Sequence, residues 1–120
     1  ERLLGNTAAQ DDAAHGRVQG SIPQDPGQAG KSQAQYLIRQ LAGRSYRATP
    51  ESGDKVTRAD PLASQAEAGN VLIVAGAWDR EFLGEMTMFP NGKFKDQVDA
   101  ASRAFAELVQ PEGYRFNLNL

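Results

Sequence analysis

The order of apolar and polar positions along the chain predicts short strands that alternate with helices. Apolar residues at helical spacing predict a helix over residues 32–42, and Gly43 is the residue expected just past its end. The unbroken apolar run Val71-Leu72-Ile73-Val74 predicts a buried strand. Turn and capping residues divide the rest of the chain. The other expected elements are helices over residues 2–10, 54–68, 79–89 and from 95 onward, and strands over 17–24 and 45–49.

The helix expected over residues 54–68 carries two special positions. Ser52 and Asp54 can each cap its first turn, because a short side-chain oxygen accepts a hydrogen bond from an amide near a helix start. Pro61 lies further along, where proline is poorly tolerated, and predicts either a kink or a late start of this helix.

Composition limits the classes of function. The chain has 120 residues with a net charge of −2, so it has no global attraction to nucleic acid and any DNA contact must be local. It has no cysteine, which excludes disulfides and thiolate metal sites, and no apolar run approaches a membrane span. We expect one domain or a piece of one over residues 1–110 and a C-terminal tail over 111–120. The chain starts at Glu1 and not at a Met.

Asp25 is the first candidate for chemistry. It follows the strand expected over residues 17–24 and enters a turn made by Pro26 and Gly27 that opens a helix. In α/β sheets, ligands gather outside the carboxyl ends of strands, because loops and helix starts converge there. Proline restricts the backbone and glycine permits unusual turns, so this carboxylate is expected on a stiff support beside exposed backbone.

The same turn has a partial likeness to a phosphate-binding P-loop. Residues 27–32 end in Gly-Lys-Ser, but the position that should hold the first glycine of a P-loop is Asp25. The strand expected over 71–74 also runs into Ala75-Gly76 instead of an acidic magnesium ligand. The spacing and the missing acidic ligand therefore make this partial motif a weak signal for a P-loop nucleotide site.

Asp96 and Asp99 open the last expected helix. Being three residues apart, they lie on one side of its first turn, where the helix dipole favours negative charge. One interpretation is therefore capping and first-turn electrostatics. The other is metal binding, since Asp25 and Asp96 supply the hard oxygen ligands that Mg²⁺ prefers if the fold brings them within about 8 Å.

Four motifs in order resemble the C-terminal nuclease domain of bacteriophage terminase large subunits. The resemblance spans roughly residues 5–108 and implies a ribonuclease H-like α/β fold, in which a mixed sheet is flanked by helices. It also implies a metal-dependent endonuclease that acts on double-stranded DNA. The motifs are Pro23-Gln24-Asp25-Pro26-Gly27-Gln28-Ala29-Gly30-Lys31 with Gln35-Tyr36-Leu37, then Gly53-Asp54-Lys55-Val56-Thr57-Arg58-Ala59, then Phe89-Pro90-Asn91-Gly92, and Asp96-Gln97-Val98-Asp99-Ala100.

The resemblance implies roles for particular residues. Asp25 and Asp96 match catalytic, metal-binding carboxylates that use Mg²⁺ or Mn²⁺, and Asp99 matches a secondary acidic metal position. Lys55 and Arg58 match a basic segment that meets DNA phosphate. Lys31 is expected to border the Asp25 site and to contact DNA as well.

Two departures from the family pattern shape the functional expectation. Phe94-Lys95 replaces a His-Asp pair, and the family's first catalytic Asp lies on an initial strand that should precede Glu1. We therefore expect the latter part of a nuclease domain, without its first strands and with weak activity. The alternative is a non-catalytic packaging or assembly module that docks DNA, motor or portal.

The resemblance also implies partners and a location. The partners would be double-stranded DNA, an ATPase motor domain in the same polypeptide, the portal and the small terminase subunit. The location would be the cytoplasm of a bacterial host, with no membrane association.

Overall fold

A computed structural model describes residues 18–51 and 53–109. They belong to two compact units, which divide between Ser52 and Gly53. The helix expected over residues 2–10 and the tail over 111–120 lie outside the described residues. Within the described ranges, no helix is long and apolar enough to cross a membrane. The elements are β1 (Gln19–Gln24), α2 (Gln28–Gln40) and β2 (Ser45–Pro50) in the first unit, and α3 (Lys55–Glu67), α4 (Asp79–Met88) and α5 (Asp96–Val109) in the second.

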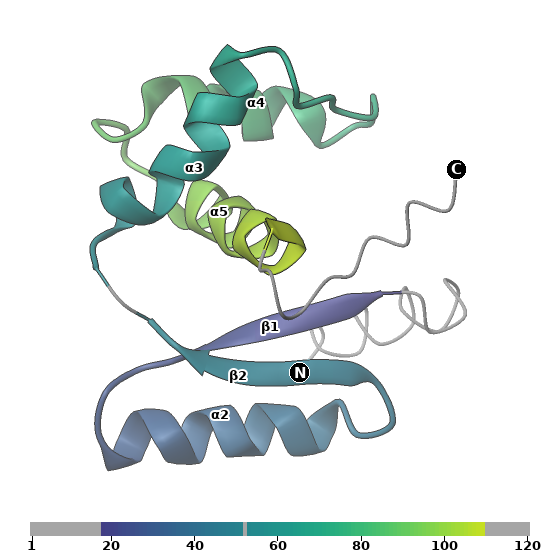
Figure 1. Cartoon of the computed structure of the whole chain (residues 1–120), viewed down its shortest axis with the longest axis vertical. Helices are drawn as coiled ribbons and strands as arrows, with labels where there is room; N and C mark the ends of the chain where they lie inside the picture. Colours follow the sequence, from purple (N-terminus) through teal and green to yellow (C-terminus); the bar gives the residue numbers. More distant parts are fainter. Residues whose placement is uncertain (1–17, 52, 110–120) are drawn as a thin grey trace. The chain divides into compact units, whose positions relative to one another are not determined.

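The first unit is a strand, a helix and a second strand parallel to the first. The pairing of β1 with β2 runs in register from Gln19 opposite Ser45 to Gln24 opposite Pro50. Helix α2 connects the two strands and lies along one face of the sheet (Figure 1). Ala34 of α2, 1% exposed, is buried in this packing. Because the strands are parallel, both carboxyl ends reach the same edge.

The sequence predicted this unit well. Strand β2 begins at the expected residue, and β1 ends at the expected Gln24, while Arg17 lies outside the described residues. Helix α2 begins four residues earlier than expected, since the amide of Lys31 already donates to the carbonyl of Gly27 at 3.2 Å. The earlier start brings the first turn of α2 next to Asp25 in sequence.

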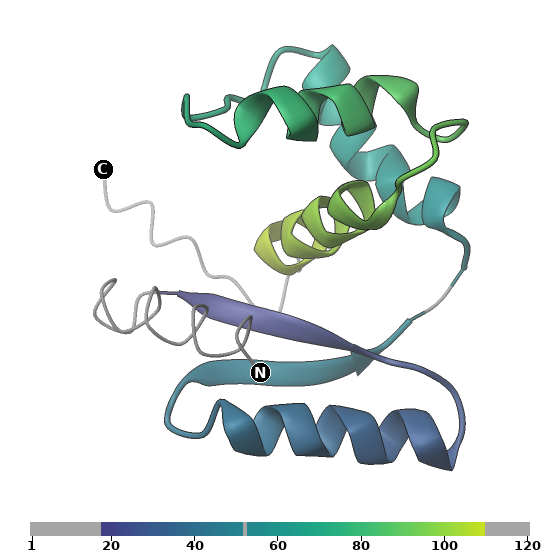
Figure 2. The same ribbon diagram turned by 180° about the vertical axis from the view of Figure 1, so that it is seen from behind.

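The second unit is a group of three helices, in which α3 and α4 both pack against α5 (Figure 2). Leu62 of α3 and Val98 of α5 are buried, as the apolar stripes predicted. Ser102 is also buried, and its hydroxyl donates to the carbonyl of Val98 at 2.7 Å, which satisfies a polar group in an apolar setting. The first half of α5 thus presents Val98 and Ser102 to the core of this unit.

Pro61 lies inside α3 without delaying its start. Of the two predicted outcomes, a kink or a late start, the late start is wrong, because the helix runs from Lys55 to Glu67. Proline lacks the N–H that would donate to the carbonyl of Thr57, and its ring disfavours the preceding turn, at a cost of about 3 kcal/mol. The cap at Asp54 and the burial of Leu62 support the helix on either side.

The prediction of a buried strand at 71–74 is also wrong. Residues 71–76 form no regular secondary structure, and Leu72 and Val74 are 93% and 83% exposed. A strand needs a hydrogen-bonding neighbour, and within the described residues the sheet contains β1 and β2 alone. The apolar composition of a segment does not provide that neighbour.

Candidate functional site

Asp25 directly follows β1 and lies against the first turn of α2. Gly27 adopts a φ of 93°, a conformation that favours glycine, and Gly30 follows in the first turn. A Cβ atom at position 30 would lie 2.7 Å from the carbonyl carbon of Asp25, so a glycine is needed for this close approach. The turn therefore holds the backbone of Asp25 against the helix while its side chain stays at the surface.

A hollow of about 440 Å³ opens at this edge of the first unit. Glu51 lines it together with Asp25 and directly follows β2, as Asp25 directly follows β1. The backbone amide of Glu51 donates a hydrogen bond to the carbonyl of Gln24 at 3.4 Å. The hydrogen bonding between β1 and β2 therefore continues up to the hollow. The hollow is lined by Gln24, Asp25, Pro26, Gly27, Gln28, Lys31, Pro50 and Glu51.

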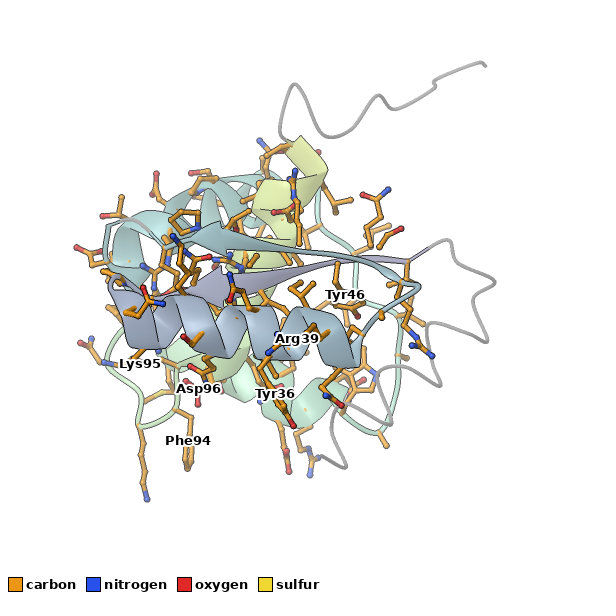
Figure 3. All side chains as sticks on the ribbon, turned by 90° about the horizontal axis from the view of Figure 1, so that it is seen from below. Tyr36, Arg39, Tyr46, Phe94, Lys95 and Asp96 are labelled. Atoms are coloured by element: carbon orange, nitrogen blue, oxygen red, sulfur yellow. The ribbon has the colours of Figure 1, made fainter. Side chains whose placement is uncertain are left out.

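Asp96 is the first residue of α5 and is highly exposed. Its side chain is 97% exposed, and its Oδ1 lies 3.5 Å from the Nζ of Lys55 on α3. An ion pair in such an exposed position contributes little stability, because water and salt screen it. Figure 3 shows Phe94, Lys95 and Asp96 in sequence where α5 begins. The carboxylate of Asp96 thus remains accessible from solvent despite its lysine neighbour.

Asp99, three residues further in the first turn of α5, is held by Arg58. Its two carboxylate oxygens accept from Nε and Nη2 of Arg58 at 3.1 and 3.2 Å. The remaining Nη1 donates to the carbonyl of Gly53 at 2.7 Å. The side chains of Arg58 and Asp99 are only 20% and 18% exposed. This two-bond ion pair, called the Arg58–Asp99 fork below, therefore joins α3 to α5 with little access to solvent. Both oxygens of Asp99 are engaged by a cation of the protein.

Comparison with protein families identifies the class of this domain. The family described as terminase RNaseH-like domain matches residues 4–108. The chain belongs to this family. Comparison with curated proteins and with solved structures gives no significant match. The terminase resemblance and the α/β ribonuclease H-like class are therefore confirmed, and the part of the fold that is described contains the two-stranded sheet and four helices.

The two units of this terminase domain each contain part of the predicted site. The first unit has Asp25 and Lys31 at one hollow. The second has Lys55 beside Asp96 and Arg58 bound to Asp99. Their assignment to catalysis, metal and DNA remains a prediction.

The residues present can supply ligands for a divalent metal. Nuclease domains of this terminase class generally use divalent metals. Asp25, Glu51 and Asp96 offer carboxylate oxygens, the ligands that Mg²⁺ prefers, and Mg²⁺ keeps several waters and needs few protein ligands. Within the described residues, no group of three or more metal-binding side chains gathers at one place. These carboxylate oxygens are therefore suitable ligands for Mg²⁺, with one or two carboxylates in each unit able to bind it.

Sequence reasoning missed Glu51 and Glu85. Glu51 directly follows β2, just as Asp25 directly follows β1. Parallel pairing of the two strands was the signal that could have found it. Glu85 accepts a hydrogen bond at 2.7 Å from the backbone amide of Val98 on α5. This contact joins two helices, so no local sequence motif predicts it.

Asp54 is the N-cap of α3, as the sequence predicted. Its Oδ1 accepts from the amide of Thr57 at 2.7 Å. The backbone hydrogen bond from Thr57 is the main cause that lowers the pKa of Asp54 below 3.8, and hydrogen bonding by the Thr57 side chain adds to it. A group with a lowered folded-state pKa stabilises the protein above its unfolded pKa, and this contribution is lost as the pH falls through the folded value.

We expect Asp54→Ala to lower the melting temperature at pH 7, because the amide of Thr57 loses its acceptor. The difference from the parent chain should shrink below about pH 4, where the parent carboxylate itself becomes protonated. Melting curves of both proteins between pH 3 and pH 7 measure this. A constant difference over the whole range would contradict a charged cap.

Proposed function

We propose that this terminase domain cleaves double-stranded DNA with Mg²⁺ or Mn²⁺, with Asp25 and Asp96 as catalytic metal ligands. The observation that carries the proposal is the family match over residues 4–108, which includes all four motifs of the resemblance. The accessibility of both carboxylates supports it, because a metal that acts on DNA must be reached by the phosphate. Glu51 is a further ligand candidate, since it lines the same hollow as Asp25.

The bound cation would stabilise charge on the scissile phosphate and favour ionisation of an attacking water. The residues of the chain have distinct tasks in this proposal. Asp25 offers its carboxylate from a rigid turn, and Asp96 offers a second from the first turn of α5. Asp99 is next to Asp96 in that turn, and we assign it chiefly to the fork with Arg58 that fixes the turn. Lys95, adjacent to Asp96, reduces the local negative charge, so we expect slow cleavage.

The DNA-contacting residues would be Lys31, Lys55 and Arg58. Lys31 lies at the start of α2 beside the hollow of Asp25, and Lys55 begins α3 with a side chain 42% exposed. Arg58 directs its donors at Asp99 and Gly53, so its charge would act on phosphate from a fixed position. The proposed contacts are therefore local and electrostatic.

We expect Lys31→Ala and Lys55→Ala each to weaken duplex binding similarly for all sequences. Each phosphate contact releases counterions, so the slope of log affinity against log salt should fall by about one unit per contact. Binding measured across a salt series, with Arg39→Ala as a control for an exposed cation in the last turn of α2, tests this. Unchanged slopes in both variants would assign these lysines to surface ion pairs.

The proposal extends to partners and location, for which the family gives general support. We propose that double-stranded DNA is the substrate and that the domain works beside an ATPase motor domain, with the portal and the small terminase subunit as partners. The proposed location is the cytoplasm of a bacterial host. The packaging of bacteriophage DNA would then supply the substrate.

A non-catalytic docking module is the second candidate function. A specific observation favours it: Lys55 faces Asp96 and Arg58 holds Asp99, so cations of the protein stand beside two carboxylates that could otherwise attract a metal. In this alternative the domain binds DNA, motor or portal without cleaving. The fold and the charged surface would then serve assembly.

Incubation of the chain with supercoiled plasmid separates the two candidates. We expect slow nicking with Mn²⁺, slower nicking with Mg²⁺, and none with EDTA. The same samples in a gel-shift experiment show whether DNA is bound. Binding without cleavage in either metal would contradict the nuclease proposal and support the docking module.

A further inference from the structure

The first turn of α5 lacks a cap from its own sequence. Lys95 precedes the helix, and its carbonyl accepts from the amide of Asp99 at 3.0 Å, as the residue before a helix does. Its side chain carries only donors and cannot accept from the free amides of the first turn. The helix that presents Asp96 must therefore obtain an acceptor from elsewhere.

Glu85 of α4 provides this acceptor. Its Oε2 accepts a hydrogen bond from the backbone amide of Val98 at 2.7 Å, and its Oε1 accepts one from the side-chain amide of Gln97 at 3.4 Å. Val98 is the third residue of α5, the position whose amide an ordinary N-cap side chain satisfies. The carboxylate also places negative charge at the positive end of the helix.

The same glutamate lies beside Asp96. Glu85, Phe94, Asp96 and Gln97 line one hollow of about 690 Å³ between α4 and the start of α5. Val98, whose amide Glu85 holds, is 2% exposed, so the contact anchors the turn to the core of the unit. Asp96 occupies the exposed side of that turn, with a side chain that is 97% exposed.

We propose that Glu85 is a positioning residue that caps α5 from the neighbouring helix and thereby fixes the direction in which Asp96 offers its carboxylate. This inference rests on the proposed role of Asp96 as a metal ligand. Arg58 binds Asp99 in the same first turn, so the start of α5 is held by both α3 and α4. A loosely held first turn would present Asp96 in many directions and weaken metal binding.

The test compares Glu85→Ala, Glu85→Gln and Glu81→Ala in the whole chain. The glutamine retains an oxygen that can accept from Val98, whereas alanine removes the acceptor. Glu81 lines the same hollow from the same helix and serves as the matched control. Two quantities are measured: hydrogen exchange of the Val98 amide by NMR, and the affinity for Mn²⁺ by calorimetry.

We expect Glu85→Ala to speed exchange of the Val98 amide about tenfold. Its Mn²⁺ affinity should fall by about tenfold or more, the range seen when support of a metal ligand is lost. Glu85→Gln should rescue most of both losses, and Glu81→Ala should change neither.

Faster exchange with an unchanged Mn²⁺ affinity in Glu85→Ala would overturn the positioning role. The positioning role would also be overturned if Glu85→Gln kept the Val98 amide protected from exchange but lost Mn²⁺ affinity. That result would identify Glu85 as a metal ligand itself. Failure of the unsubstituted chain to bind Mn²⁺ would overturn the proposed metal site, and the positioning role with it, whatever the exchange rates.

Discussion

Replacement of Asp25 with Asn is expected to abolish Mn²⁺-dependent nicking and to weaken Mn²⁺ binding by about tenfold or more. The amide has nearly the same shape but no charge, so the backbone contacts with Gly30 should persist. The loss would therefore report on the carboxylate itself. Calorimetry with Mn²⁺ and plasmid nicking on the same preparation measure the two effects.

Asp60→Asn is the matched control for Asp25→Asn. Asp60 is an exposed aspartate within α3 that is not among the residues lining the hollow of Asp25, and the same charge is removed. We expect its substitution to leave nicking and Mn²⁺ affinity within about twofold of the parent, because Asp60 is no ligand in the proposal and an exposed charge is screened by salt. Equal behaviour of the two variants would remove Asp25 from the proposed site.

Asp99→Ala is expected to lower the free energy of unfolding by about 2–3 kcal/mol. The substitution leaves the guanidinium of Arg58, 20% exposed, without the carboxylate that accepts from its Nε and Nη2. Removal of one charge from a partly buried ion pair is costly, because the remaining guanidinium has lost water and no longer has the opposite charge. Urea unfolding of the parent and the variant provides the comparison.

Two further variants distinguish the contribution of the paired hydrogen bonds between Arg58 and Asp99 from that of charge attraction alone. Arg58→Lys retains the positive charge but cannot donate two parallel hydrogen bonds to Asp99, so it should retain only part of the stability. Arg58→Met with Asp99→Ala removes both charges and should be less destabilised than Asp99→Ala alone. A loss below about 0.5 kcal/mol in Asp99→Ala, the range of ordinary surface substitutions, would contradict a structural role for this pair.

Local signals allowed much of the fold to be predicted from the sequence. The strand before Asp25 and the cap at Asp54 were predictable, because turn and capping chemistry depend on residues adjacent in sequence. The start of α5 at Asp96 followed from acidic residues before an apolar stripe. The family motifs then placed the domain among terminase RNaseH-like domains.

The remaining features depend on contacts between distant residues. The run from Val71 to Val74 has the composition of a buried strand, but pairing with another strand decides whether such a segment becomes one. Glu51 reaches the hollow of Asp25 only through the parallel crossover, and Glu85 reaches α5 only through helix packing. Periodicity and motif spacing carry no information on such pairings.

Paramagnetic broadening by Mn²⁺ tests the central proposal, metal binding by Asp25 and Asp96, most directly. Substoichiometric Mn²⁺ is added to isotope-labelled chain, and the loss of backbone amide NMR signals is followed residue by residue. The account predicts early broadening around Asp25 and Gly27 and around Asp96 and Gln97, suppressed by Asp25→Asn and by Asp96→Asn and reversed by EDTA. Broadening that spreads over surface carboxylates such as Asp60, with no preference for these residues, would contradict it.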